Sequence, residues 1–206
     1  NFTSERKNNG FLYKADAYPD LKGILCGPAQ GKNARTTLTA IEILGEIGYN
    51  IPKEATVFIY GGNLGKPQGL GFLTEVLEAN SGKRDRYFIV VGSGTEKPRL
   101  NEWFAKHPLD NAIMLEALPK LEYDKLVRSC DVGLIFLDRS FTIPNYPSRL
   151  LSYMEYKMPV LVASDIHTDI GTIAETNGYG LWAKHGDLEA FNAQLDKLVG
   201  NTPLIN

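Results

Sequence analysis

The feature that most constrains the fold of this chain is an alternation, from Ala55 onward, between short apolar runs and helical segments. The apolar runs are rich in β-branched and aromatic residues, which favour strands. Parallel strands need crossover connections, and a helix between two successive strands supplies one. The alternation therefore predicts an α/β fold in three layers, with a parallel sheet of about six strands covered by helices.

The hydrophobic pattern also places the individual elements. The expected strands are residues 56–60, 87–91, 112–115, 132–136, 160–163 and 180–182. The expected helices are residues 70–80, 98–106, 121–129, 148–156, 170–176 and 188–199. Right-handed crossovers put the loops that follow the strands along one edge of the sheet, and we expect a ligand to bind at that edge.

Residues 1–50 lack this regularity, because turn residues interrupt them at 8–10, 18–20 and 27–31. We interpret residues 1–50 as an irregular N-terminal extension, in which only residues 36–48 predict a helix. Residues 51–206 then form the α/β domain. Because the sequence does not begin with Met, we expect a fragment or a processed form.

Composition argues against several classes of protein. The formal net charge is -2 at pH 7 and the basic residues form no long run, so no nucleic-acid partner is expected. Cys26 and Cys130 lack the spacing of metal ligands, which argues against a disulfide framework or a zinc site and favours a reducing cytoplasm. No apolar stretch reaches the length of about 18 residues that a membrane-spanning helix requires.

Glycine-rich loops follow the first two expected strands. The first, residues 61–69, has four glycines in nine residues and leads into a helix. Glycine lets backbone N–H groups approach an anion at a helix start, and Lys66 adds a mobile charge. The second loop is residues 92–98. Taken alone, the first loop is equally compatible with a tight turn, and the second is more typical of a loop that needs flexible residues. The absence of a strict G-x-G-x-x-G and of an acidic residue after Val91 disfavours a nicotinamide-dependent oxidoreductase.

A third loop, residues 142–154, contains a cation in an unusual place. Pro147 and Ser148 open a helix whose first turn carries Arg149, although a cation at a helix N-terminus opposes the macrodipole. A bound diphosphate would resolve this conflict, because Arg149 can form bidentate bonds to phosphate oxygens. The alternative is a solvated Arg149.

These three loops, in this order and spacing, resemble the C-terminal domain of the GT-B glycosyltransferases of family 4, also called group 1. The matching segments are 60–69, 92–94, 129–134, 147–154 and 158–161, within a match from Ile51 to Val199. Within the family, these segments are similar to the branch that builds bacterial capsules and O-antigens, including fucosamine-type transferases. The resemblance implies a Rossmann-like sheet that forms one half of a GT-B fold, with residues 1–50 as an extension or a remnant of the interdomain region.

The resemblance also implies roles for individual residues. Arg149 and Lys66 are the expected catalytic residues, because they would stabilise the leaving diphosphate. The expected donor-binding residues are Gly61, Gly62, Asn63, Gly65, Gln68, Gly69, Gly92, Ser93, Leu118, Pro147, Ser148 and Ser152. Leu118 lies in the segment 115–121, which matches the region where relatives cradle the base.

The sequence departs from the family pattern at the expected ribose contact. Many members carry two glutamates eight positions apart, and Pro144 and Ser152 stand at those positions here. A serine can hydrogen-bond a hydroxyl but lacks the charge that strengthens such a bond. Glu155, one turn further along, is either a partial substitute or a surface residue.

No cofactor and no metal ion are expected. The sequence contains no Asp-x-Asp pair and no histidines with ligand spacing. We interpret His107, His167 and His185 as surface residues, with His167 also a candidate for the cleft.

The resemblance implies a retaining, hexosyl-type glycosyltransferase. It would move a sugar from a nucleoside-diphosphate sugar, expected to be a UDP-sugar, to a glycan or lipid-linked acceptor in capsular or lipopolysaccharide synthesis. The N-terminal domain that holds the acceptor is expected to be missing, so the isolated chain should bind nucleotide with little or no turnover. A cytoplasmic protein is expected, whose full-length form can associate peripherally with the inner membrane face. The alternatives are a GT-B sugar-nucleotide epimerase and a non-catalytic nucleotide-sugar-binding module.

Overall fold

The computed structural model describes residues 51–52, 54–140 and 146–199, together with three strands within residues 1–50. The chain divides into two compact units, Asn1–Asn50 and Ile51–Asn206. In the first unit, β1 (Phe2–Lys7), β2 (Gly10–Ala15) and β3 (Ile24–Leu25) form an antiparallel sheet in that order.

This small sheet differs from the irregular segment that the sequence predicts. Lys7 pairs with Gly10, so only two residues separate β1 from β2, and such a short connection is typical of a β-hairpin. Gly10, which the sequence pattern counts among the interrupting turn residues, is thus the first residue of β2. The helix expected at residues 36–48 lies outside the described residues.

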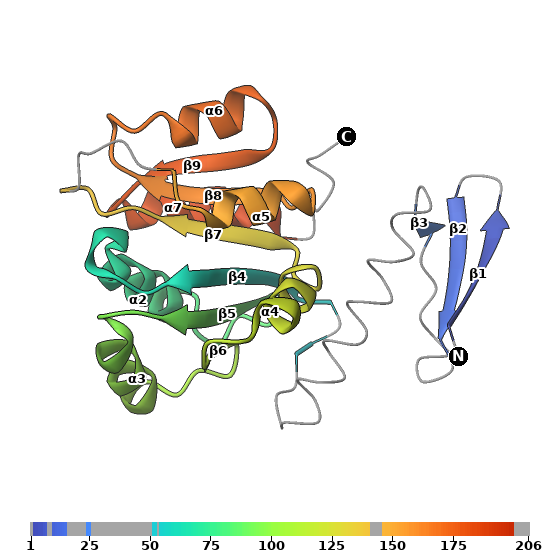
Figure 1. The fold of residues 1–206 in the computed structure, drawn as a ribbon, viewed down its shortest axis with the longest axis horizontal. Coiled ribbons are helices and arrows are strands. Elements are labelled where there is room, and N and C mark those ends of the chain that lie inside the picture. Colours follow the sequence, from blue (N-terminus) through green and yellow to red (C-terminus); the bar gives the residue numbers. More distant parts are fainter. Residues whose placement is uncertain are drawn as a thin grey trace. The chain divides into compact units, whose positions relative to one another are not determined.

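The second unit contains a six-stranded parallel sheet in the order β6-β5-β4-β7-β8-β9 (Figure 1). Its strands are β4 (Thr56–Asn63), β5 (Arg86–Ser93), β6 (Ala112–Leu115), β7 (Val132–Phe136), β8 (Val160–Ser164) and β9 (Gly180–Lys184). Every pairing in this sheet is parallel. The predicted α/β fold is confirmed.

Helices follow the strands close to the predicted positions. They are α2 (Leu70–Ala79), α3 (Lys97–Lys106), α4 (Lys120–Val127), α5 (Arg149–Glu155), α6 (Ile170–Thr176) and α7 (Leu188–Leu198), with a 3-10 helix η1 (Lys66–Gln68) before α2. Local sequence signals explain where two of these helices begin. The carboxylate of Asp187 accepts the N–H of Ala190 at 3.0 Å and caps α7, and Pro98 stands in the first turn of α3.

The sheet separates two hydrophobic faces, because alternate residues of a strand point to opposite sides. On one face, Phe136 of β7 packs against Phe72 of α2 and Phe191 of α7. On the other face, the ring of Tyr153 from α5 covers Gly133 of β7, where an added Cβ would lie 2.4 Å from the ring. Helices therefore cover both faces of the sheet, and the edge at the strand ends remains for a site.

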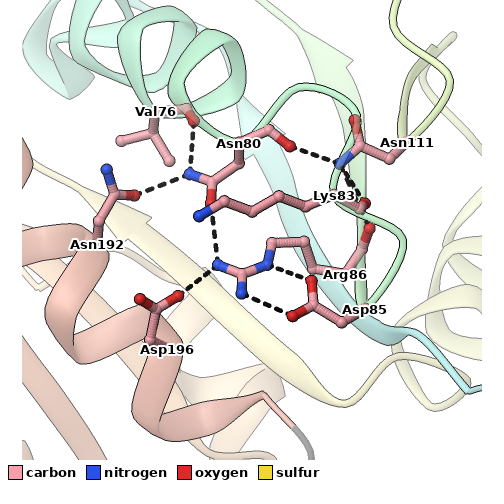
Figure 2. A network of polar contacts seen from close by, with 8 residues as sticks. All are labelled: Val76, Asn80, Lys83, Asp85, Arg86, Asn111, Asn192 and Asp196. Carbon is pink, nitrogen blue, oxygen red and sulfur yellow. Dashed lines mark hydrogen bonds and ion pairs between the residues drawn. The ribbon is translucent and has the colours of Figure 1, made fainter.

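A buried polar network holds the amino-terminal edge of the sheet (Figure 2). Arg86, the first residue of β5, is 4% exposed, and its Nη1 donates to Asn80 at 2.9 Å and to Asp196 at 2.6 Å. Its Nε and Nη2 both donate to Asp85. Asn111 donates to the backbone carbonyl of Asn80 at 2.8 Å. These bonds join α2 and α7 to the starts of β5 and β6, at the edge opposite the loops that follow the strands.

Candidate functional site

The order of the strands changes direction between β4 and β7. β5 and β6 lie on one side of β4, whereas β7, β8 and β9 lie on the other. The connections that leave β4 and β7 therefore diverge, and open parallel sheets bind ligands in the crevice that forms at such a point. The segments after these strands are residues 64–69 and 137–148, of which 141–145 lie outside the described residues. The topology thus identifies these two segments as the candidate site.

β4 and β5 run further than predicted, into both glycine-rich segments. Gly62 pairs with Gly92, and Asn63 pairs with Ser93. Gly92 has a φ of +152°, and a Cβ at this position would lie 1.9 Å from the carbonyl oxygen of Gly62. The predicted strand ends at residues 60 and 91 are therefore too early, because glycine lets the two strands stay together up to the site. Asn63 and Ser93 are exposed at this point.

The turn between β4 and α2 is held by one of its own side chains. The N–H of Gly65 donates to Oε1 of Gln68 at 3.1 Å, and the N–H of Gln68 donates to the carbonyl of Gly65 at 3.1 Å. Gln68 is 5% exposed, and Gly69 completes the turn in the left-handed region at φ 58°. Gln68 therefore shapes the turn, whereas Lys66, at the start of η1, is exposed.

Arg149, the first residue of α5, is 6% exposed, which contradicts the alternative of a solvated arginine. Its Nη2 donates to the carbonyl of Asn63 at 3.0 Å, so it contacts the end of β4. Its guanidinium carbon lies 4.2 Å from the centroid of the Tyr60 ring. Its Nη1 is buried and has no hydrogen-bond partner among the described residues. The side chain thus brings a buried cation with an unused donor to the end of β4, beside the point where the strand order changes direction.

Two tyrosines line the same strand end. Burial raises the pKa of Tyr60, and the neighbouring Arg149 only partly opposes that effect. Burial likewise raises the pKa of Tyr123, whose hydroxyl lies where a Cβ on Gly61 would sit, at 2.2 Å. Both phenols are therefore neutral near pH 7, and neither supplies the negative charge that Arg149 lacks. Gly61 is buried beneath Tyr123.

Other predicted donor residues lie around the start of α5. Pro147 is buried and Ser148 is exposed, and Ser148 makes no side-chain capping bond to the helix. Ser152 is half-buried one turn along the helix, and Glu155 is exposed. Pro144, where the first family glutamate is expected, lies outside the described residues.

The segment after β6 lies at the far side of the same edge. Leu118 is half-buried there, between β6 and α4. Glu116 forms an ion pair with Lys97 at the start of α3, and so connects this segment to the one after β5. The assignment of Leu118 to the base remains a prediction.

His185 was not predicted as part of the site. It directly follows β9 and is 7% exposed, so its interpretation as a surface residue is wrong. Its Nε2 lies 3.1 Å from the carbonyl oxygen of Gly69, and Asp138 after β7 donates its N–H to the carbonyl of Pro67 at 2.9 Å. The available signal was its position after the sixth parallel strand, at the edge that collects the loops. His167 is exposed after β8.

The described residues contain no group of three or more His, Cys, Asp or Glu side chains that could hold a metal ion. In the same part of the chain, no helix is both long and apolar enough to cross a membrane.

This chain is similar to known proteins both in sequence family and in fold. The family model for glycosyl transferases group 1 matches residues 47–205. The C-terminal domain of the group 1 glycosyl transferase LpcC from Francisella tularensis has a TM-score of 0.56 at 18% identity, over 75% of this chain and 80% of that one. HepE from Anabaena, solved in complex with UDP and glucose, has a TM-score of 0.62 at 16% identity, over 82% of this chain and 44% of HepE. At these identities the two structures establish a shared fold.

A curated relative matches part of the sequence. WcaI of Escherichia coli (strain K12), whose name assigns it to glycosyl transfer in colanic acid biosynthesis, is 27% identical over 132 residues. The match covers 62% of this chain and 31% of WcaI, so the chain spans less than half the length of this relative.

Proposed function

The chain belongs to the glycosyl transferases group 1 family, and from this membership we propose that its Ile51–Asn206 unit binds the nucleoside-diphosphate sugar of a retaining glycosyl transfer reaction. A UDP-sugar is the proposed donor, supported by the UDP and glucose in the complex of HepE. A glycan or a lipid-linked sugar in surface-polysaccharide synthesis is the proposed acceptor, in keeping with the pathway in the name of WcaI. A cytoplasmic location at the inner membrane face belongs to the same proposal.

One observation carries the proposal, the buried guanidinium of Arg149 with its unused Nη1. Leaving a buried cation uncompensated is costly, and the phenols beside it are neutral. A diphosphate that binds beside Asn63 would supply both the opposite charge and the missing acceptor. Arginine suits this ligand, because its planar fork donates to two phosphate oxygens at once.

The proposed chemistry follows from the leaving group. The bond between the anomeric carbon and the diphosphate oxygen breaks, and a bond from the acceptor hydroxyl oxygen to the same carbon forms on the same face. The acceptor hydroxyl transfers its proton to the departing diphosphate oxygen. Negative charge develops on the diphosphate, where Arg149 and the exposed Lys66 would stabilise it. No metal ion or other cofactor is part of this proposal.

The acceptor site is proposed to lie in sequence outside this chain, which spans 31% of WcaI. We therefore expect the isolated chain to bind the donor with little or no turnover. Transfer at ordinary transferase rates by the isolated chain would contradict this part of the proposal.

Calorimetric titration of the full chain with UDP, GDP and dTDP tests donor binding. Arg149→Ala should weaken the binding of the preferred nucleotide by roughly 10- to 100-fold, the range expected for losing a charged hydrogen-bond partner. Arg128→Ala is the matched control, because Arg128 is exposed and lies 4.4 Å from the ring centroid of Tyr156. The control should bind as the unmodified chain does. Equal affinity of Arg149→Ala and Arg128→Ala would overturn the phosphate assignment.

A further inference from the structure

The turn that carries Lys66 is stabilised by its own hydrogen bonds and also by a contact from a distant part of the chain. Gly69 ends this turn, and its carbonyl accepts the N–H of Phe72 at 3.0 Å in the first turn of α2. The same carbonyl lies 3.1 Å from Nε2 of His185. Because a carbonyl only accepts, the ring nitrogen donates, and the proton of the neutral imidazole is on Nε2.

The segments that follow three strands, β4, β7 and β9, meet at Gly69. A Cβ at this position would lie 2.4 Å from Nε2 of His185, after β9, and 2.9 Å from Oδ2 of Asp138, after β7. The φ of Gly69 is also positive, at 58°. Only glycine fits both the backbone and the space, so His185 and Asp138 close tightly on the turn after β4.

The ring of His185 is locked in this position. Its centroid lies 4.9 Å from that of Phe72, and its backbone N–H donates to the carbonyl of Ser164 at 2.8 Å. Its Nδ1 is buried and has no partner among the described residues. A second proton on Nδ1 would therefore be a buried donor without an acceptor, which is unfavourable.

We propose that neutral His185 is a positioning residue for the donor: it holds Gly69, and through it the turn that carries Lys66, in the conformation that binds a nucleoside diphosphate. This inference rests on the proposed function for its ligand. His185 acts through Gly69 and does not touch the substrate.

The charged groups around His185 set the direction of its response to pH. Burial lowers the pKa of His185, and Arg139 after β7 acts in the same direction. Asp138 and Glu75 of α2 oppose this, together with the bond to Gly69. His185 is therefore neutral at pH 7.5, and acid converts it to the form that the site does not accommodate.

Two variants of the full chain separate the hydrogen bond from the ring. His185→Gln places an amide N–H near the position of Nε2 and does not titrate. His185→Phe keeps a ring against Phe72 but removes the donor. UDP affinity is measured by calorimetry at pH 7.5 and at an acid pH where imidazole ¹⁵N resonances report a second proton on His185, and circular dichroism checks the fold of each variant.

The unmodified chain should lose more UDP affinity at that acid pH than either variant does, since any titration of UDP itself is common to all three. At pH 7.5, His185→Gln should bind as the unmodified chain does, and His185→Phe should bind about fivefold more weakly, in line with one lost hydrogen bond. Full affinity of His185→Phe at pH 7.5, or an unchanged pH response in His185→Gln, would overturn the inference.

If the proposed function is wrong, the binding experiments give a different result from the one that overturns the inference about His185. In that case the unmodified chain would bind none of UDP, GDP and dTDP at either pH. The state of His185 is then read from imidazole ¹⁵N resonances, which should report a proton on Nε2 alone at pH 7.5. In His185→Phe, the amide resonance of Gly69 should shift. A proton on Nδ1 alone, or an unmoved Gly69 resonance, would refute the inference without reference to any nucleotide.

Discussion

Arg149 and Tyr60 form a cation–π pair at the end of β4, with the guanidinium carbon 4.2 Å from the ring centroid. The hydroxyl of Tyr60 donates to the carbonyl of Asn63 at 3.1 Å, and Nη2 of Arg149 donates to the same carbonyl at 3.0 Å. The ring therefore packs against the guanidinium, and the shared carbonyl links both side chains to the end of β4. In the proposed site, the geometry that a phosphate meets depends on Tyr60.

Replacing Tyr60 tests this dependence. Tyr60→Phe keeps the ring and should change UDP affinity by less than about threefold, because only one shared hydrogen bond is lost. Tyr60→Leu removes the ring, and a desolvated cation–π contact is worth about 1 to 2 kcal/mol, so UDP should bind about tenfold more weakly. Calorimetry measures both affinities. Equal affinities for the two variants would refute a role for the ring.

Gly92 and Gly82 provide a second, matched comparison. Both have positive φ, at +152° and +73°, but a Cβ on Gly92 would strike the backbone of Gly62 whereas a Cβ on Gly82 would meet nothing within 4 Å. Gly82→Ala should therefore cost about 1 kcal/mol of unfolding free energy from backbone strain alone. Gly92→Ala should cost about 3 kcal/mol or more, because β4 and β5 must separate. Urea denaturation measures both values, and similar losses would contradict the close approach of the strands.

β4 and β5 also show which features of the fold the sequence pattern predicts and which it does not. The alternation of elements predicts all six strands of the sheet, because each run and each helix is a local signal. The ends of β4 and β5 were predicted too early, since Gly61 and Gly62 are typical of a turn in isolation. Their strand conformation depends on pairing with Val91 and Gly92, which is a non-local contact.

In the candidate site, too, local features could be predicted from the sequence and contacts between distant segments could not. The sequence predicts Arg149 at the start of a helix, and the structure places it there. Its stacking on Tyr60 depends on the sheet bringing together segments that are distant in sequence. His185 was missed because its partner Gly69 lies 116 residues away, and no local pattern distinguishes it from a surface histidine.

The network around Arg86 in Figure 2 predicts a large effect on stability, far from the site. Arg86→Ala leaves Oδ1 of the buried Asn80 without the donor that Nη1 provides, and an unsatisfied buried acceptor costs about 1 to 3 kcal/mol. Arg99→Ala is the matched control, because the side chain of Arg99 is 51% exposed in its pair with Glu96. It should cost less than about 1 kcal/mol. Urea denaturation at pH 7 distinguishes the two, and a loss below 1 kcal/mol in Arg86→Ala would argue against a stabilising network.

Asp165 gives a prediction for acid stability. It is 3% exposed in the turn between β8 and α6, where its carboxylate accepts the N–H groups of His167 at 2.6 Å and Thr168 at 3.0 Å and the hydroxyl of Thr168 at 2.6 Å. Burial alone would raise the pKa of Asp165, but these bonds outweigh burial and hold it below its ordinary value of 3.8. The folded state therefore binds a proton less readily than the unfolded state does.

The sign of the effect follows from that difference. The stabilisation by the Asp165 carboxylate is fully present above the ordinary pKa and is lost as the pH falls through the lower folded value. Asp165→Asn should therefore lower the unfolding free energy by about 1 to 3 kcal/mol at pH 7, and the difference from the unmodified chain should shrink below pH 4. Asp110→Asn, at an exposed position, should leave both values unchanged. Urea denaturation at pH 7 and pH 3 measures these differences, and a gap of equal size at both pH values would mean that the charge of Asp165 does not stabilise the turn.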